Sequence, residues 1–79
     1  MKTLLDLEKN KSCYIKKIHG NELDVIRVRS IGFFEGEKVT FLYAAPFKKH
    51  LAYEVSGNVI GLSKRLATKI EIVEDSDAK

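Results

Sequence analysis

Apolar and polar residues alternate with a period of two along most of this chain, which is the pattern of half-buried β-strands. The alternation is clearest in KVTFLYA, where Val39, Phe41 and Tyr43 share one face. We therefore predict a mainly β domain in which the side chains of Phe41, Tyr43 and Tyr53 point inward. The five predicted strands span residues 13–18, 38–44, 51–55, 59–62 and 70–73.

The strand predicted over residues 13–18 defines its buried face less clearly. Strict alternation places Cys13 and Ile15 on one face and Ile18 on the opposite face. The pattern therefore predicts a strand here without showing which face is buried.

A tight turn is predicted between the strands at residues 51–55 and 59–62. Ser56, Gly57 and Asn58 are residue types that adopt the backbone conformations of short β-turns. We therefore expect these two strands to pair antiparallel as a hairpin. A short polar segment, SKRLATK, separates them from the last predicted strand.

The segment NELDVIRVRSIG fits two different structures. Its β-branched residues alternate with arginines, as in a strand across residues 24–31. It also fits a helix, because Asn21 is a good N-cap, acids occupy the first turn, and Val25, Val28 and Ile31 recur every third residue. We predict a short helix, which would end near the glycine at position 32.

The length and composition are those of one small folded domain. The chain has 79 residues, of which 44% are hydrophobic and 32% are charged. No apolar run approaches the roughly 20 residues that span a bilayer, and charged residues interrupt the N-terminus too early for a signal peptide. The single cysteine, Cys13, cannot form an internal disulfide, which is typical of a reducing compartment. We therefore expect a cytoplasmic protein without membrane insertion.

Charge is distributed unevenly along the chain. Residues 1–70 carry 13 Lys and Arg against 7 Asp and Glu, a net charge of +6, whereas residues 71–79 carry 1 against 4, a net charge of −3. A basic body attracts nucleic acid, anionic membrane or an acidic protein surface. We expect residues 74–79 to form an acidic, disordered tail.

Residues that could perform catalysis or bind a metal are isolated in the sequence. Cys13, His19 and His50 form no CxxC, HxxxH or HxxE pair, whereas a structural zinc site needs four ligands. Nothing places a nucleophile beside a histidine and an orienting acid, and the chain contains no glycine-rich phosphate-binding loop. We predict a protein that is not an enzyme and that has no catalytic residues, no metal site and no cofactor.

Several short motifs follow one another along the chain: Ile31-Gly32, Gly36, Val39 to Tyr43, Ala45-Pro46, Gly57, Ile60 to Leu62 and Ala67 to Ile70. Together with a leucine-rich N-terminal segment, they cover nearly the whole chain. Their order and spacing resemble the ferrous iron transport protein A (FeoA) family, although Asn10 replaces a turn glycine of the family pattern. The resemblance implies an SH3-like β-barrel of about five strands with one or two short helices over residues 1–73. In that fold, the bend between Gly32 and Gly36 joins the short helix to the second strand.

The resemblance also implies a function. It suggests a cytoplasmic accessory protein that docks on the GTPase-bearing ferrous iron permease FeoB and regulates Fe(II) uptake. A weak homo-oligomer is compatible with this function. Aromatic anchors with a basic rim are typical of protein interfaces. We therefore predict a partner-binding surface that consists of Arg27, Arg29, Phe33, Phe34, Lys48, Lys49 and His50.

Two alternative functions stay open from the sequence. The first is nucleic-acid binding, in which basic residues contact phosphates and aromatic rings stack on bases. The basic residues concerned are Arg27, Arg29, Lys48, Lys49, Lys64 and Arg65. The second is a stand-alone module related to the C-terminal domain of metal-dependent repressors, although this chain has no helix-turn-helix to accompany it.

Overall fold

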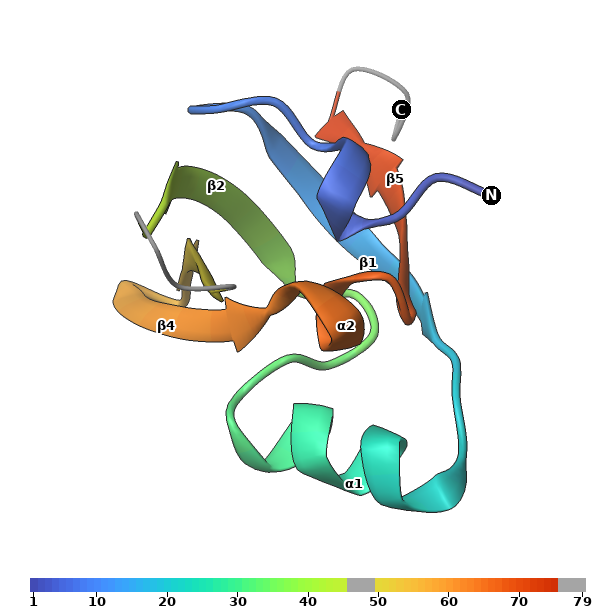
Figure 1. Ribbon diagram of the computed structural model, residues 1–79. Helices are drawn as coiled ribbons and strands as arrows, with labels where there is room; N and C mark the ends of the chain where they lie inside the picture. The colour runs from blue at the N-terminus through green and yellow to red at the C-terminus, as the bar shows by residue number, and fades with distance from the viewer. Residues whose placement is uncertain (46–49, 76–79) are drawn as a thin grey trace.

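A computed structural model describes residues 1–45 and 50–75 and contains a five-stranded antiparallel sheet (Figure 1). The strands are arranged in the order β4-β3-β2-β1-β5. Helix α1 lies at one end of the molecule, away from the N-terminal 3-10 helix η1 (Figure 1). The elements are η1 (Leu4–Asp6), β1 (Ser12–Ile18), α1 (Glu22–Ser30), β2 (Lys38–Ala44), β3 (His50–Val55), β4 (Asn58–Ser63), α2 (Lys64–Ala67) and β5 (Ile70–Glu74). The mainly β prediction and all five predicted strands are confirmed.

Strand β1 contains an irregularity that changes which residues it buries. Its pairing with β5 shifts register between Ile15 and Lys17. Because such a bulge reverses the alternation of faces, Cys13, Ile15 and Ile18 are all buried, and Lys17 is exposed. The expectation that Ile18 faces away from Cys13 is therefore wrong.

Strand β2 has a similar irregularity. Phe41 pairs with Tyr53, but Tyr43 pairs with Ala52, so two residue steps on β2 correspond to one on β3. Beyond this shift the side chain of Tyr43 points outward and is 51% exposed. The prediction that Tyr43 faces inward is wrong, whereas Tyr53 is fully buried.

The predicted hairpin is confirmed. Strand β3 ends at Val55 and β4 begins at Asn58, so the turn consists of two residues, Ser56 and Gly57. Both turn residues have positive φ, 52° and 81°, as in a type I′ turn, whose twist matches that of the paired strands. Asn10 also has a positive φ of 65°, which agrees with its place at a glycine position of the family pattern.

The segment after β1 is a helix, and the strand alternative is wrong. Asn21 is the N-cap, and its side-chain oxygen accepts a hydrogen bond of 2.8 Å from the backbone N–H of Asp24. The expected stripe of apolar residues is buried in part. Val28 is fully buried, but Ile31 lies beyond the helix at the C-cap and is exposed.

The hydrophobic core is centred on Tyr53 and Phe33, which are both fully buried. Their rings meet edge to face, with centroids 6.2 Å apart. The hydroxyl of Tyr53 donates a hydrogen bond of 3.2 Å to the backbone carbonyl of Leu4 in η1, so its polar atom is satisfied inside the core. The polar segment SKRLATK forms α2, capped by Ser63, and contributes buried Leu66 to the same core.

The C-terminal strand extends slightly further than predicted. β5 runs to Glu74, which pairs with Cys13 in β1. The expected acidic tail over 74–79 therefore begins inside a strand, and residues 76–79 lie outside the described residues.

Candidate partner-binding surface

The bend after α1 places two adjacent phenylalanines in opposite environments. Gly32 has φ of 115° and Gly36 has φ of 89°, a region that favours glycine. The backbone N–H of Phe33 bonds to the carbonyl of Val28, and that of Gly36 bonds to Ile15 in β1. Phe33 is fully buried, whereas Phe34 is 46% exposed. Phe33 is therefore a core residue, and its predicted place on the partner-binding surface is wrong.

Helix α1 presents apolar side chains that the sequence analysis missed. Leu23 is 62% exposed and Ile26 is 55% exposed, although both are large and apolar. Residues three apart lie on the same side of a helix, so these two side chains share the outward face. Their spacing was visible in the sequence, but the valines of the same helix fit the same periodicity. We use the name α1-bend surface for Leu23, Ile26, Arg27 and Phe34.

The two arginines predicted for this surface have different surroundings. The guanidinium of Arg29 lies 3.1 Å from both carboxylate oxygens of Glu35, so it joins the end of α1 to the bend. The backbone N–H of Glu35 itself and the Arg29 guanidinium lower the pKa of the Glu35 carboxyl. Arg27 is exposed, and the described part of the chain shows no ion pair for it. Arg27 is therefore the better placed of the two to meet a partner.

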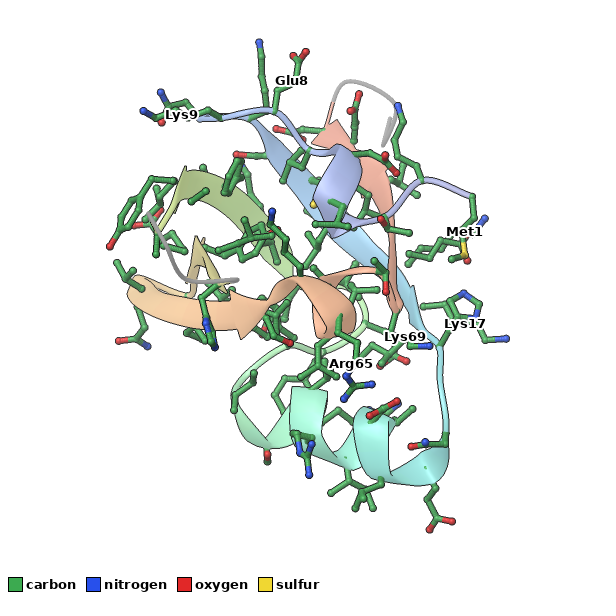
Figure 2. All side chains as sticks on the ribbon, viewed as in Figure 1. Met1, Glu8, Lys9, Lys17, Arg65 and Lys69 are labelled. Atoms are coloured by element: carbon green, nitrogen blue, oxygen red, sulfur yellow. The ribbon has the colours of Figure 1, made fainter. Side chains whose placement is uncertain are left out.

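A second ion pair joins α1 to α2. The guanidinium of Arg65 lies 3.0 Å and 3.3 Å from the two carboxylate oxygens of Asp24. Figure 2 shows Arg65 between the two helices. Its hydrogen bonds and positive charge lower the pKa of Asp24, whose residue is 6% exposed. This pair orients the helix from which Leu23 and Ile26 project.

Three loop residues were predicted to belong to the partner-binding surface, and the structure describes one of them, His50. Lys48 and Lys49 lie outside the described residues. His50 is exposed and begins β3, where it pairs with Ser63. Among the described residues, no hydrogen bond or ion pair links His50 to α1 or to the bend.

Two of the three candidate metal ligands, His19 and Cys13, have structural environments. His19 Nε2 lies 2.9 Å from Glu71 Oε1, and Lys16 Nζ lies 3.5 Å from Glu71 Oε2. Burial, followed by the charges of Glu74 and Asp75, raises the pKa of Cys13 to about 12, so its reactive thiolate is suppressed. Within residues 1–45 and 50–75, no three His, Cys, Asp or Glu side chains gather as metal ligands would. In the same residues, no helix has the length and apolar composition needed to cross a membrane.

The architecture defines a small SH3-like β domain with large apolar side chains exposed on helix α1 and the bend, and also on β2 and β4. The FeoA domain model matches residues 2–74, and the chain therefore belongs to the FeoA family. This confirms the resemblance found in the sequence. Comparison with curated proteins gives no significant match.

Solved structures of FeoA proteins have the same fold. Iron(II) transport protein A from Clostridium thermocellum superimposes with a TM-score of 0.82 at 25% identity, covering 94% of this chain and 46% of the other. Stenotrophomonas maltophilia FeoA, a procaryotic SH3 domain protein in complex with zinc, has a TM-score of 0.73 at 25% identity, covering 96% and 92%. These neighbours confirm the SH3-like fold.

The two alternative functions receive different support. For the alternative of a module related to metal-dependent repressors, the comparison is with the manganese-activated repressor ScaR. The structure of ScaR with bound zinc matches with a TM-score of 0.80 at 22% identity, over 91% of this chain and 36% of that chain, which shows a shared fold. For nucleic-acid binding, aromatic rings must be accessible to bases. Tyr53 is fully buried and Phe41 is partly buried against the core, whereas the rings of Tyr43 and Phe34 are exposed and accessible.

Proposed function

We propose that this protein is a cytoplasmic accessory protein of ferrous iron uptake that binds the cytoplasmic part of a FeoB-type GTPase permease. Membership of the FeoA family supports the link to ferrous iron transport. The α1-bend surface supports action through protein contact, because it offers apolar anchors beside an arginine rather than a catalytic cluster. Recruitment to the inner face of the membrane would then follow from the permease and not from the accessory protein.

The observation that carries this proposal is the exposure of Phe34 next to a fully buried Phe33. A small domain has few apolar residues to spare, yet Phe34, Leu23 and Ile26 remain outside the core. Apolar side chains that are covered by a partner gain roughly 25 cal/mol for each Å² of apolar surface removed from water. Binding would therefore stabilise the residues that folding leaves exposed.

The experiment compares two adjacent substitutions in the presence of the permease. We expect Phe34→Ala to reduce Fe(II) uptake in cells and co-purification with the FeoB-type permease, while the melting temperature changes by only a few degrees. Phe33→Ala should instead lower the free energy of unfolding by about 3–5 kcal/mol, because it removes a buried aromatic ring. Ile26→Ala should weaken permease binding in the same direction as Phe34→Ala.

The matched control is Tyr43→Ala, which removes an aromatic side chain of similar exposure from β2. It should leave uptake and permease binding at the wild-type level. Normal uptake and normal co-purification in both Phe34→Ala and Ile26→Ala would show that the α1-bend surface is not the contact.

A further inference from the structure

The two edge strands of the sheet, β5 and β4, differ in how far other segments of the chain cover their outer edges. At one border, β5 is covered by the N-terminal segment, because Thr3 forms a bridge with Glu71 and the backbone N–H of Ile72 bonds to the carbonyl of Lys2 at 2.9 Å. At the other border lies β4, and β3 is the one strand that pairs with it within the described residues. The outer edge of β4 therefore presents backbone groups that the described residues do not pair.

The sequence of β4 lacks the devices that usually protect such an edge. Natural edge strands carry charged residues, proline or a bulge, because their unpaired backbone groups can pair with strands of other molecules. β4 reads NVIGLS, without a charged residue or a proline, and its register with β3 is regular from His50↔Ser63 to Val55↔Asn58. The strand is therefore suited to accept another strand.

The hairpin geometry identifies which residues face outward. A two-residue turn is closed by a hydrogen bond between its flanking residues, here Val55 and Asn58. Hydrogen-bonded and non-hydrogen-bonded pairs then alternate along an antiparallel ladder. The N–H and C=O groups of Val59 and Gly61 therefore point away from β3, toward the outer edge.

We propose that β4 pairs antiparallel with β4 of a second copy of this chain, about a two-fold axis that passes beside Ile60. In this register Val59 of each copy lies opposite Gly61 of the other. The outward N–H and C=O groups of these residues form four hydrogen bonds across the axis, and the half-buried Ile60 side chains of the two copies meet at the centre.

The side chains of β4 favour a second copy over a strand of another protein. Val59 is 60% exposed, and Gly61 has no heavy atom within 4 Å of where a Cβ would lie, so each valine meets open space on the opposing strand. With no charge on β4, self-pairing places no like charges opposite each other. The interface is short, which predicts a weak dimer. Because each copy carries a net charge of +3, added salt should strengthen the dimer by screening.

The experiment measures association of the full chain by sedimentation equilibrium from about 20 µM to about 1 mM, a range suited to weak complexes. Two variants address the edge. Val59→Lys places a charge on it, and Gly61→Pro removes an outward N–H without touching the hydrogen bonds to β3. Because Gly61→Pro removes two of the four hydrogen bonds, it should weaken the dimer at least about tenfold. Tyr43→Lys, on the exposed surface of β2, is the charge-matched control.

The expected result is a dimer that Val59→Lys and Gly61→Pro weaken and that Tyr43→Lys leaves unchanged, with all variants folded by circular dichroism. The amide protons of Val59 and Gly61 should also exchange more slowly as the wild-type concentration rises. A wild-type monomer at every concentration, or a dimer unaffected by the two edge variants, would overturn the proposal. If a partner's peptide protects these amides while the chain alone stays monomeric, the edge receives a foreign strand and self-pairing is wrong. These outcomes do not depend on permease binding.

Discussion

Gly32 determines how a small domain buries one phenylalanine and exposes the next. Its φ of 115° lies in a region that residues with a Cβ rarely adopt. A Cβ at this position would also lie 3.1 Å from Cδ1 of Ile60 in β4. The glycine therefore serves both the turn out of α1 and the close packing of the bend against the sheet.

We expect Gly32→Ala to lower the free energy of unfolding by at least about 1–2 kcal/mol, because the backbone becomes strained and the new methyl group presses on Ile60. Gly36→Ala is the matched control, since Gly36 has φ of 89° but no heavy atom within 4 Å of a Cβ. Urea unfolding of both variants separates the two effects. Equal destabilisation of both variants would show that contact with Ile60 contributes nothing.

Helix α1 is fastened to the rest of the domain mainly at its inner side and its two ends. Val28 is fully buried, the Asp24–Arg65 pair links the first turn to α2, and the Arg29–Glu35 pair links the last turn to the bend. Leu23 and Ile26 project on the outward side of this helix. The ion pairs therefore orient the surface that we propose for the permease.

The Asp24–Arg65 pair predicts how stability depends on pH. Hydrogen bonding to Arg65 lowers the pKa of Asp24 below its ordinary value of 3.8. The pair therefore stabilises the fold at pH values above 3.8, and this stabilisation is lost as the pH falls through the pKa of Asp24 in the folded state. We expect Asp24→Asn to melt a few degrees below the wild type near neutral pH, with a difference that shrinks below pH 3.8. Thermal unfolding across pH, with Glu22→Gln of the same turn as the control, tests this. A difference that stays constant into acid would contradict it.

Elements from both ends of the chain pack into one hydrophobic core. Tyr53 contacts Phe33 from the bend, and its hydroxyl bonds to Leu4 of η1. His19, directly after β1, is paired with Glu71 of β5. Of the three candidate metal ligands, His19 is thus engaged in holding the fold and the Cys13 thiol is buried, whereas His50 is exposed.

We expect the protein purified without a metal-affinity tag to contain no stoichiometric metal. The physical reason is that His19 is paired with Glu71 and Cys13 is buried, so neither is available beside other ligands in the described residues. Elemental analysis should give a metal content far below one atom per chain. A one-to-one content of iron or zinc that is lost in His19→Ala or His50→Ala would refute this expectation.

Local chemistry was sufficient to predict several elements. The Asn21 cap, the Gly32 stop and the Ser56-Gly57 turn each depend on conformations that neighbouring residues impose on one another. The faces of β1 and β2 were predicted less well. Both strands contain a register shift, and a shift exists only relative to a partner strand that is distant in sequence. The outward position of Tyr43 therefore could not follow from the alternation in KVTFLYA.

By itself, the sequence determined the five strands, the short helix and the family, because periodicity, capping and turn residues act over a few neighbouring positions. The tertiary structure decided which of two adjacent phenylalanines enters the core, since both have the same chemistry and only packing around Tyr53 distinguishes them. It also decided that the N-terminal segment covers β5 while β4 stays at the other border. Burial and edge exposure depend on contacts between distant segments, which no local pattern in the chain encodes.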